Sequence, residues 1–260
     1  MRSLLLIASL LLTACQNREA KSPVNSSERL LMATLYHQTA AEYRALCYQS
    51  YNLAKLRLDE ALKTKMDKKP AVIVDVDETV LDNSNYEARQ ILDGTSYSFE
   101  TWKTWTDLCA AIPVPGALEF LKYAASKGVD VFYVTNRKLV EKQSTTENLR
   151  KMGFPNADTA FVMPRTTEGS KEPRRRAIQA THEIVLLCGD NLNDFSSIFE
   201  DKPTAERFAV TDSVQSLFGS RFIVLPNPMY GDWDTALFNG QRGLSDSAKT
   251  NLRKAALRSY

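Results

Sequence analysis

Two aspartates, Asp75 and Asp77, directly follow the short apolar run 71–74, and their spacing suits metal chemistry. Residues two apart near the end of a strand can point to the same side of a sheet. Two carboxylates held together attract a hard divalent cation, and Mg²⁺ takes one or two carboxylates together with phosphate oxygens. An isolated Asp-x-Asp is usually a turn or a surface pair. An EF-hand is excluded because Val80 stands where that calcium loop needs Gly.

More polar residues follow other apolar runs at comparable points. Thr135 and Asn136 come after a second run, and Asp190 and Asp194 come after a third. Lys171 lies between these two, where a helix is expected to start. Ligands of open α/β sheets bind at the carboxyl ends of the strands, so all these side chains are expected at one edge. The complete set predicts a phosphate site that holds a metal ion, since chance placement at three strand ends is improbable.

The elements that must carry these residues alternate along the chain. Short β-branched runs predict strands at residues 71–74, 129–134, 184–188, 208–210 and 222–225. Helical stretches lie between them, at residues 117–127, 139–152 and 171–181. Strands that alternate with helices indicate an α/β fold with a doubly wound parallel sheet. Apolar spacings of three and four predict two N-terminal helices within 28–65, and residues 85–115 are expected to form a helical cap.

The N-terminus predicts export and lipid attachment. A charged start and a short apolar stretch lead to small residues, so 1–14 is interpreted as a signal peptide. The stretch is too short to span a bilayer, which takes about 20 apolar residues. Leu12-Thr-Ala-Cys15 resembles the bacterial lipobox, which makes Cys15 the expected lipid attachment site. Residues 15–27 would be a flexible tether, and 28–260 the folded domain.

Composition excludes several other classes of function. The 33 basic and 31 acidic side chains leave a net charge of +2, which gives no reason to expect a nucleic acid polymer as partner. Two isolated His make a zinc site improbable. Cys47, Cys109 and Cys188 remain after lipidation, and the sequence leaves open whether two of them form a disulfide. The run 174–176 of three Arg is interpreted as a solvated face.

Two motifs carry a family resemblance. Asp75-Val-Asp-Glu-Thr-Val-Leu-Asp82 and Gly189-Asp-Asn-Leu-Asn-Asp194 resemble the haloacid-dehalogenase superfamily. Among its members the chain is most similar to the class C acid phosphatases, bacterial outer-membrane lipoproteins. The likeness extends to the lipobox, to Tyr133-Val-Thr-Asn-Arg137 and to Leu225-Pro-Asn-Pro-Met-Tyr-Gly-Asp232.

The resemblance implies a role for each polar residue. Asp75 would attack phosphorus and carry an aspartyl-phosphate, while Asp77 would protonate the leaving oxygen and later activate water. Mg²⁺ would be bound by the Asp75 side chain, the Asp77 backbone carbonyl and Asp190. Asp194 would hold a metal-bound water or orient Lys171. The phosphoryl oxygens would be neutralised by three groups, namely Thr135, the amide of Asn136 and Lys171.

The resemblance also implies a substrate class and a location. An aromatic pair, Trp102 and Tyr230, would stack on the ring of 5′-nucleotides, nicotinamide mononucleotide or aryl phosphates. Trp105 is instead expected to pack inside the cap. Gln16 rather than Asp follows Cys15, which implies the outer membrane if sorting is of the enterobacterial type. Whether the protein faces the periplasm or the cell surface is left undecided. A phosphotransferase and a non-catalytic, nucleotide-capturing lipoprotein stay as alternatives, and a homodimer is left open.

Overall fold

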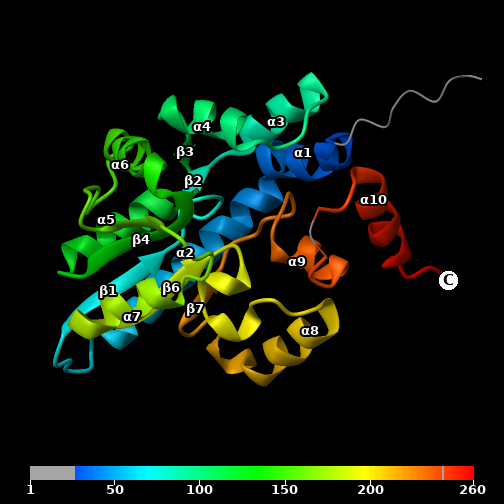
Figure 1. Cartoon of the computed structure of the whole chain (residues 1–260). Coiled ribbons are helices and arrows are strands. Elements are labelled where there is room, and N and C mark those ends of the chain that lie inside the picture. The colour runs from blue at the N-terminus through cyan, green and yellow to red at the C-terminus, as the bar shows by residue number, and fades with distance from the viewer. Residues whose placement is uncertain (1–26, 242) are drawn as a thin grey trace, which may run out of the picture.

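A five-stranded parallel sheet forms the centre of the molecule (Figure 1). The computed structural model describes residues 27–241 and 243–260. The strand order is β5-β4-β1-β6-β7, with β1 in the middle. The strands are β1 (Lys69–Val74), β4 (Asp130–Lys138), β5 (Val162–Arg165), β6 (His182–Gly189) and β7 (Phe222–Val224). This confirms the α/β fold with a parallel sheet.

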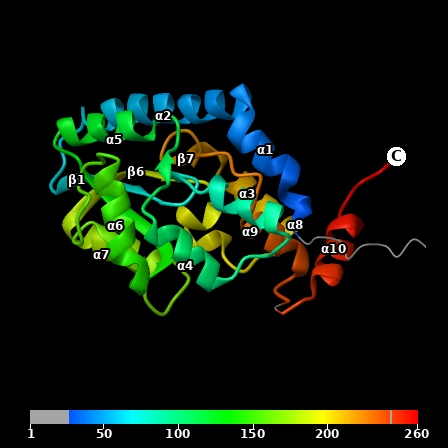
Figure 2. The same cartoon turned by 90° about the horizontal axis from the view of Figure 1, so that it is seen from above.

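The sheet is buried on both faces, as the unbroken apolar strands require. In β1, Val72 and Val74 belong to one core cluster, whereas Ala71 and Ile73 belong to the other. Residues of α2 (Ala41–Ala61) and α5 (Ala117–Ser126) complete the first cluster, and Ile178 of α7 (Glu172–Thr181) is part of the second. Figure 2 shows α2 and α5 side by side along one face. The central strand is thus fixed from both sides.

Two consecutive helices begin the described chain, as the apolar spacing predicts. They are α1 (Leu31–Thr39), which follows the short 3₁₀ turn at Glu28–Leu30, and α2. The backbone turns between them because Ala40 is extended, with φ −77° and ψ 125°. Within the described residues, no helix has the length and apolar character needed to cross a membrane. The predicted signal peptide, Cys15 and all but the last residue of the tether lie outside the described residues.

The segment 85–115, predicted as a cap, contains two helices and one strand of a small antiparallel ribbon, whose other strand β2 precedes it. These elements are α3 (Ser84–Asp93), α4 (Phe99–Asp107), β2 (Leu81–Asp82) and β3 (Ile112–Pro113). The cap contacts the N-terminal helices through α1 and α3. Past the last strand, α9 (Asp232–Thr235) and α10 (Asp246–Ala255) lie beyond the sheet (Figure 1).

Two element predictions differ from the structure. The strand predicted at 208–210 is wrong, because Phe208 to Val210 lie within α8 (Thr204–Ser213). A short apolar run does not by itself separate a strand from a helix. The edge strand β5 was not predicted, since its Pro164 argues against a strand; an edge position tolerates the missing N–H. The helix α6 (Lys142–Lys151) lies within the range 139–152 predicted for it.

Candidate active site

Three carboxylates converge beyond the carboxyl ends of β1 and β6. Asp75 follows β1, Asp190 follows β6, and Asp194 ends the short 3₁₀ turn Leu192–Asp194. One oxygen from each of the three lies within 4.8 Å of the others. Burial, and then the charges of Asp194 and Asp75, raise the pKa of Asp190 well above its usual range. Such crowding of buried acids is favourable only if positive charge lies among them.

Lys171 supplies part of that charge. Its ammonium group pairs with Asp75 and lies 2.6 Å from Oδ1 of Asp194. Burial alone would lower the pKa of Lys171, but the carboxylates of Asp194 and Asp75 outweigh burial and raise it. Burial, opposed by Lys171, raises the pKa of Asp75 to about 7. One ammonium among three acids still leaves room for a divalent cation, and an all-oxygen donor set suits a hard one.

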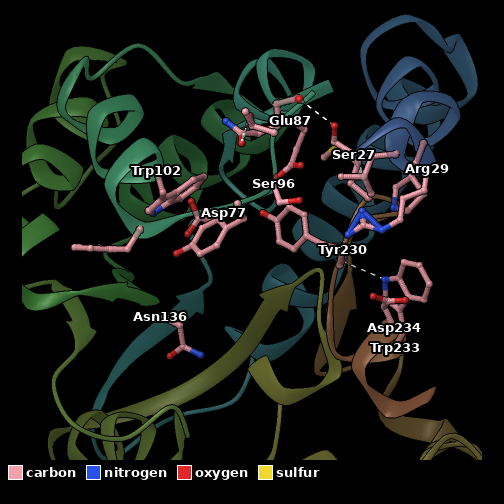
Figure 3. A pocket seen from close by; sticks show the side chains of 18 of the residues that line it. Ser27, Arg29, Asp77, Glu87, Ser96, Trp102, Asn136, Tyr230, Trp233 and Asp234 are labelled. Atoms are coloured by element: carbon pink, nitrogen blue, oxygen red, sulfur yellow. Dashed lines mark hydrogen bonds between the residues drawn. The ribbon is translucent and has the colours of Figure 1, made fainter. Parts of the chain in front are cut away.

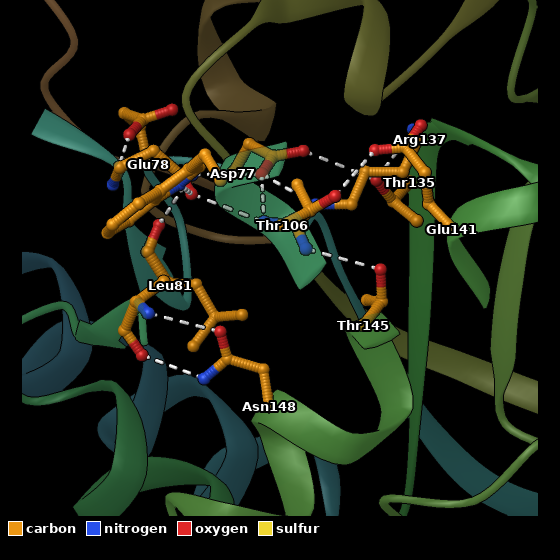
Figure 4. Close-up of polar contacts among 12 residues, drawn as sticks. Asp77, Glu78, Leu81, Thr106, Thr135, Arg137, Glu141, Thr145 and Asn148 are labelled. Carbon is orange, nitrogen blue, oxygen red and sulfur yellow. Dashed lines mark hydrogen bonds and ion pairs between the residues drawn. The ribbon is translucent and has the colours of Figure 1, made fainter. Parts of the chain in front are cut away.

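Asp77 points away from this cluster. Its Oδ1 accepts hydrogen bonds from Nε and Nη2 of Arg137 at 2.9 and 2.8 Å, and from Nδ2 of Asn83 at 2.9 Å (Figure 4). Among the described residues, its Oδ2 accepts a hydrogen bond only from the Thr135 hydroxyl, at 3.4 Å. The Asp77 carboxylate is therefore no member of the carboxylate cluster, and metal contact through its backbone carbonyl stays a prediction. One carboxylate oxygen of Asp77 is fixed by strong donors and the other is held more weakly.

The Arg run that was interpreted as a solvated face instead supports the site. Arg174 donates to the backbone carbonyl of Thr135 at 2.5 Å and to Oδ1 of Asn136 at 2.8 Å. Arg175 is buried, 5% exposed, and donates to the carbonyl of Asp194 at 2.9 Å. Only Arg176 is mainly in solvent. The first two arginines therefore fix the loops that carry the predicted phosphate-binding and acidic residues.

A large cavity opens beside the carboxylates. Its volume is about 680 Å³, and Asp77, Asn136, Trp102 and Tyr230 line it together. In Figure 3, Trp102 and Tyr230 lie on different sides of the space above Asn136. Trp105 does not line the cavity; its Nε1 donates to Oδ1 of Asn83 at 2.9 Å. Sequence reasoning missed Tyr97, Phe99 and Arg137 as lining residues, because the cap aromatics carried no spacing signal.

This fold, with acidic strand ends and a capped cavity, belongs to an established family. A family model described as HAD superfamily, subfamily IIIB (acid phosphatase), matches residues 9–233. The chain is a member of this family and is a phosphomonoesterase. Membership favours a phosphatase over a non-catalytic capture protein, and phosphatases of this superfamily use a divalent metal.

Two solved structures are similar over most of the chain. One is the class C acid phosphatase from Bacillus anthracis, with a TM-score of 0.88 and 41% sequence identity. The match covers 91% of this chain and 100% of that one. The second is the same Bacillus anthracis enzyme with tungstate bound, with the same identity, coverage and TM-score. The family resemblance predicted from the sequence motifs is confirmed.

We expect Gly189→Ala to damage the site while Gly169→Ala leaves it intact. A Cβ at position 189 would lie 2.5 Å from Oδ2 and 2.6 Å from Cβ of Asp194, whereas at 169 it would meet nothing within 4 Å. Asp194 must then shift and weaken its pairing with Lys171. Because small displacements in a site are costly, phosphatase kcat/KM is expected to fall about 100-fold. Steady-state kinetics of both variants check this, and equal activities would contradict it.

Proposed function

We propose that this acid phosphatase works through an aspartyl-phosphate on Asp75. The observation that carries the proposal is the pairing of Asp75 with Lys171 inside the carboxylate cluster. Asp75 would attack phosphorus, since a carboxylate nucleophile divides one difficult step into two easier ones. Lys171 would hold the nucleophile in place and balance charge on the phosphoryl oxygens, together with Thr135 and Asn136.

Asp77 would serve as the acid and then the base. Its Oδ1 is held by Arg137 and Asn83, so Oδ2 is the atom available to give a proton to the leaving oxygen. The same oxygen would then accept a proton from the water that hydrolyses the aspartyl-phosphate. The Thr135 hydroxyl lies beside Oδ2 and would help to keep it directed at the phosphate.

The metal we propose is Mg²⁺, bound by Asp75 and Asp190 and supported by Asp194. Asp190 is already oriented, because Nδ2 of Asn227 donates to its Oδ2 at 2.8 Å and the Thr79 hydroxyl donates to Oδ1 at 3.3 Å. When bound, Mg²⁺ would neutralise phosphoryl charge. Tungstate is a tetrahedral oxyanion like phosphate, so the ligand of the Bacillus anthracis enzyme supports an oxyanion site here.

The substrates we propose are phosphomonoesters with a flat ring. Trp102 and Tyr230 line one cavity with Asp77 and Asn136, and a base stacked on an aromatic side chain gains about 1–3 kcal/mol. This favours 5′-nucleotides, nicotinamide mononucleotide and aryl phosphates. The guanidinium of Arg137 lies 5.5 Å from the Trp102 ring centroid and links the stacking site to Asp77.

Phosphate release from these three substrates tests the proposal. We expect Mg²⁺ to support turnover and EDTA to reduce it by about 1,000-fold or more, since a metal contributes several kcal/mol of charge stabilisation. Adding Mg²⁺ back should restore the rate. Turnover that persists in EDTA, after the protein has been shown metal-free by elemental analysis, would contradict metal dependence.

We also propose that Cys15 carries a lipid and holds the enzyme at the bacterial outer membrane. Support comes from the sequence alone, through the lipobox and Gln16. Fatty-acid labelling of the full chain, compared with Cys15→Ala, tests the attachment; a variant that still labels would contradict it. The partners we propose are small-molecule phosphomonoesters. A homodimer stays a prediction, which sedimentation analysis of the oligomeric state would test.

A further inference from the structure

The large cavity contains a buried carboxyl group that phosphoryl transfer does not use. Glu87 of α3 lines the cavity and is only 9% exposed. Figure 3 shows Glu87 and Asn136 on opposite sides of the space, with Trp102 and Tyr230 also around it. The cavity therefore extends from the phosphate-handling edge of the sheet, past the stacking pair, to an acidic group in the cap.

Glu87 has no hydrogen-bond donor within the described part of the chain. The other buried carboxyl of this cavity differs: Glu141 accepts from the backbone N–H of Lys138 at 2.8 Å and from the Thr106 hydroxyl at 3.3 Å. Burial raises the pKa of Glu87 to about 7, and the only charge opposing the shift is Arg29. Glu87 lines the cavity without a donor from the described residues, so a ligand that enters the cavity can supply one.

Gln90 lies beside Glu87 and offers the complementary group. The two residues are three apart on α3, so their side chains are neighbours on one helix face. Gln90 also lines the cavity, and its Oε1 accepts from the Thr95 hydroxyl at 2.8 Å. That bond turns the amide nitrogen away from Thr95, and across the described residues Nε2 has no acceptor. The wall thus presents an unused acceptor next to an unused donor.

We propose that Glu87 and Gln90 recognise the amide or amino edge of the substrate's ring. A carboxamide offers an N–H to Glu87 and a carbonyl oxygen to the Gln90 amide, so it satisfies both groups at once. At a pH above about 7, where Glu87 is ionised, a ring that carries a carboxylate would instead place a negative charge against it, so the comparison below is made there. This inference rests on the proposed function, because it assumes that the phosphate lies at Asp75 and that the ring stacks near Trp102.

Nicotinamide mononucleotide and nicotinic acid mononucleotide form the decisive pair of substrates. They differ only in the carboxamide and carboxylate of the ring. We expect the wild-type enzyme to prefer the amide by at least about tenfold in kcat/KM, since sites built for a hydrogen-bonding group reject analogues that leave their polar groups unpaired. In Glu87→Gln the preference should fall at least about fivefold, mainly through KM, because a Gln amide can donate to the carboxylate.

Three controls make the test specific. Glu100→Gln changes an exposed acid of α4 outside the cavity and should keep the wild-type preference. The substrate p-nitrophenyl phosphate carries neither a carboxamide nor a carboxylate on its ring. Its hydrolysis should therefore be equal in wild type and Glu87→Gln. Thermal unfolding of Glu87→Gln reports whether this isosteric change affects the fold.

An unchanged preference in a folded Glu87→Gln variant would overturn the inference. Binding of the same two mononucleotides to Asp75→Asn, measured by calorimetry with and without Glu87→Gln, gives the answer without turnover. If p-nitrophenyl phosphate were not hydrolysed by wild type but the binding preference depended on Glu87, the proposed chemistry would fail and the recognition role would stand. If hydrolysis proceeded and the binding preference ignored Glu87, only the recognition role would fail.

Discussion

Asp75→Asn is expected to reduce phosphatase kcat by about 10⁴-fold or more, because the substitution removes the nucleophile and not merely a binding contact. Asn keeps the shape of the side chain but cannot form a stable phosphoryl ester. The variant should still bind oxyanions, since Lys171, Thr135 and Asn136 remain. Rapid-quench measurements with ³²P-labelled substrate check this, with label on the wild-type protein and none on Asp75→Asn.

Asp93→Asn is the matched control for this change. Asp93 ends α3 and, among the described residues, pairs only with Arg89 on the surface, so its loss should leave turnover unchanged. Substantial turnover by Asp75→Asn would identify a different nucleophile, provided that mass spectrometry excludes deamidation back to Asp. Label trapped on the variant would lead to the same conclusion.

Arg137→Met should reduce kcat/KM about 100-fold for nicotinamide mononucleotide and much less for p-nitrophenyl phosphate. Arg137 is 3% exposed and fixes Oδ1 of Asp77 with two donors, so its loss lets the acid turn away from the leaving oxygen. An alkoxide must be protonated as it leaves, whereas nitrophenolate leaves without help. Because kcat/KM covers only binding and the steps up to phosphoryl transfer, it excludes the later role of Asp77 as a base.

The difference between the two substrates separates positioning from general loss of structure. Damage to the fold would lower both activities equally, and such a result would contradict the positioning role. Arg137→Lys should restore part of the rate on the mononucleotide by supplying one donor. Arg150→Met changes an exposed arginine of α6, paired with Glu147, and serves as the control.

The sequence predicts the sheet well because its central strands are defined by strong local signals. The strands β1, β4 and β6 are unbroken apolar runs that end in polar residues, which leaves little ambiguity. The errors occur at the periphery, where signals are mixed. The α8 segment is apolar enough to resemble a strand, although its Phe208 is 60% exposed, and β5 carries a Pro that only an edge position accepts.

The sequence also predicts that Asp75, Asp190 and Asp194 meet, but not that the Asp77 carboxylate turns to Arg137, nor how the site is supported. Strand ends of one parallel sheet must lie at one edge, and this brings Asp75, Asp190 and Asp194 together. The supporting roles of Arg137 and Arg175 were not predicted, because an arginine next to other charged residues resembles a surface residue. Their buried partners are a side chain 60 positions away and a backbone carbonyl 19 away, which no local pattern reveals.

Ser27 connects the start of the described chain with the far wall of the cavity. Its hydroxyl donates to the backbone carbonyl of Gln90 at 3.0 Å, and it lines the cavity itself. Ser27 is twelve positions beyond Cys15, a span of at most about 43 Å when fully extended. A lipid on Cys15 would therefore confine the cavity to a layer of that depth above the bilayer. The enzyme would then act only on phosphomonoesters that diffuse into this layer.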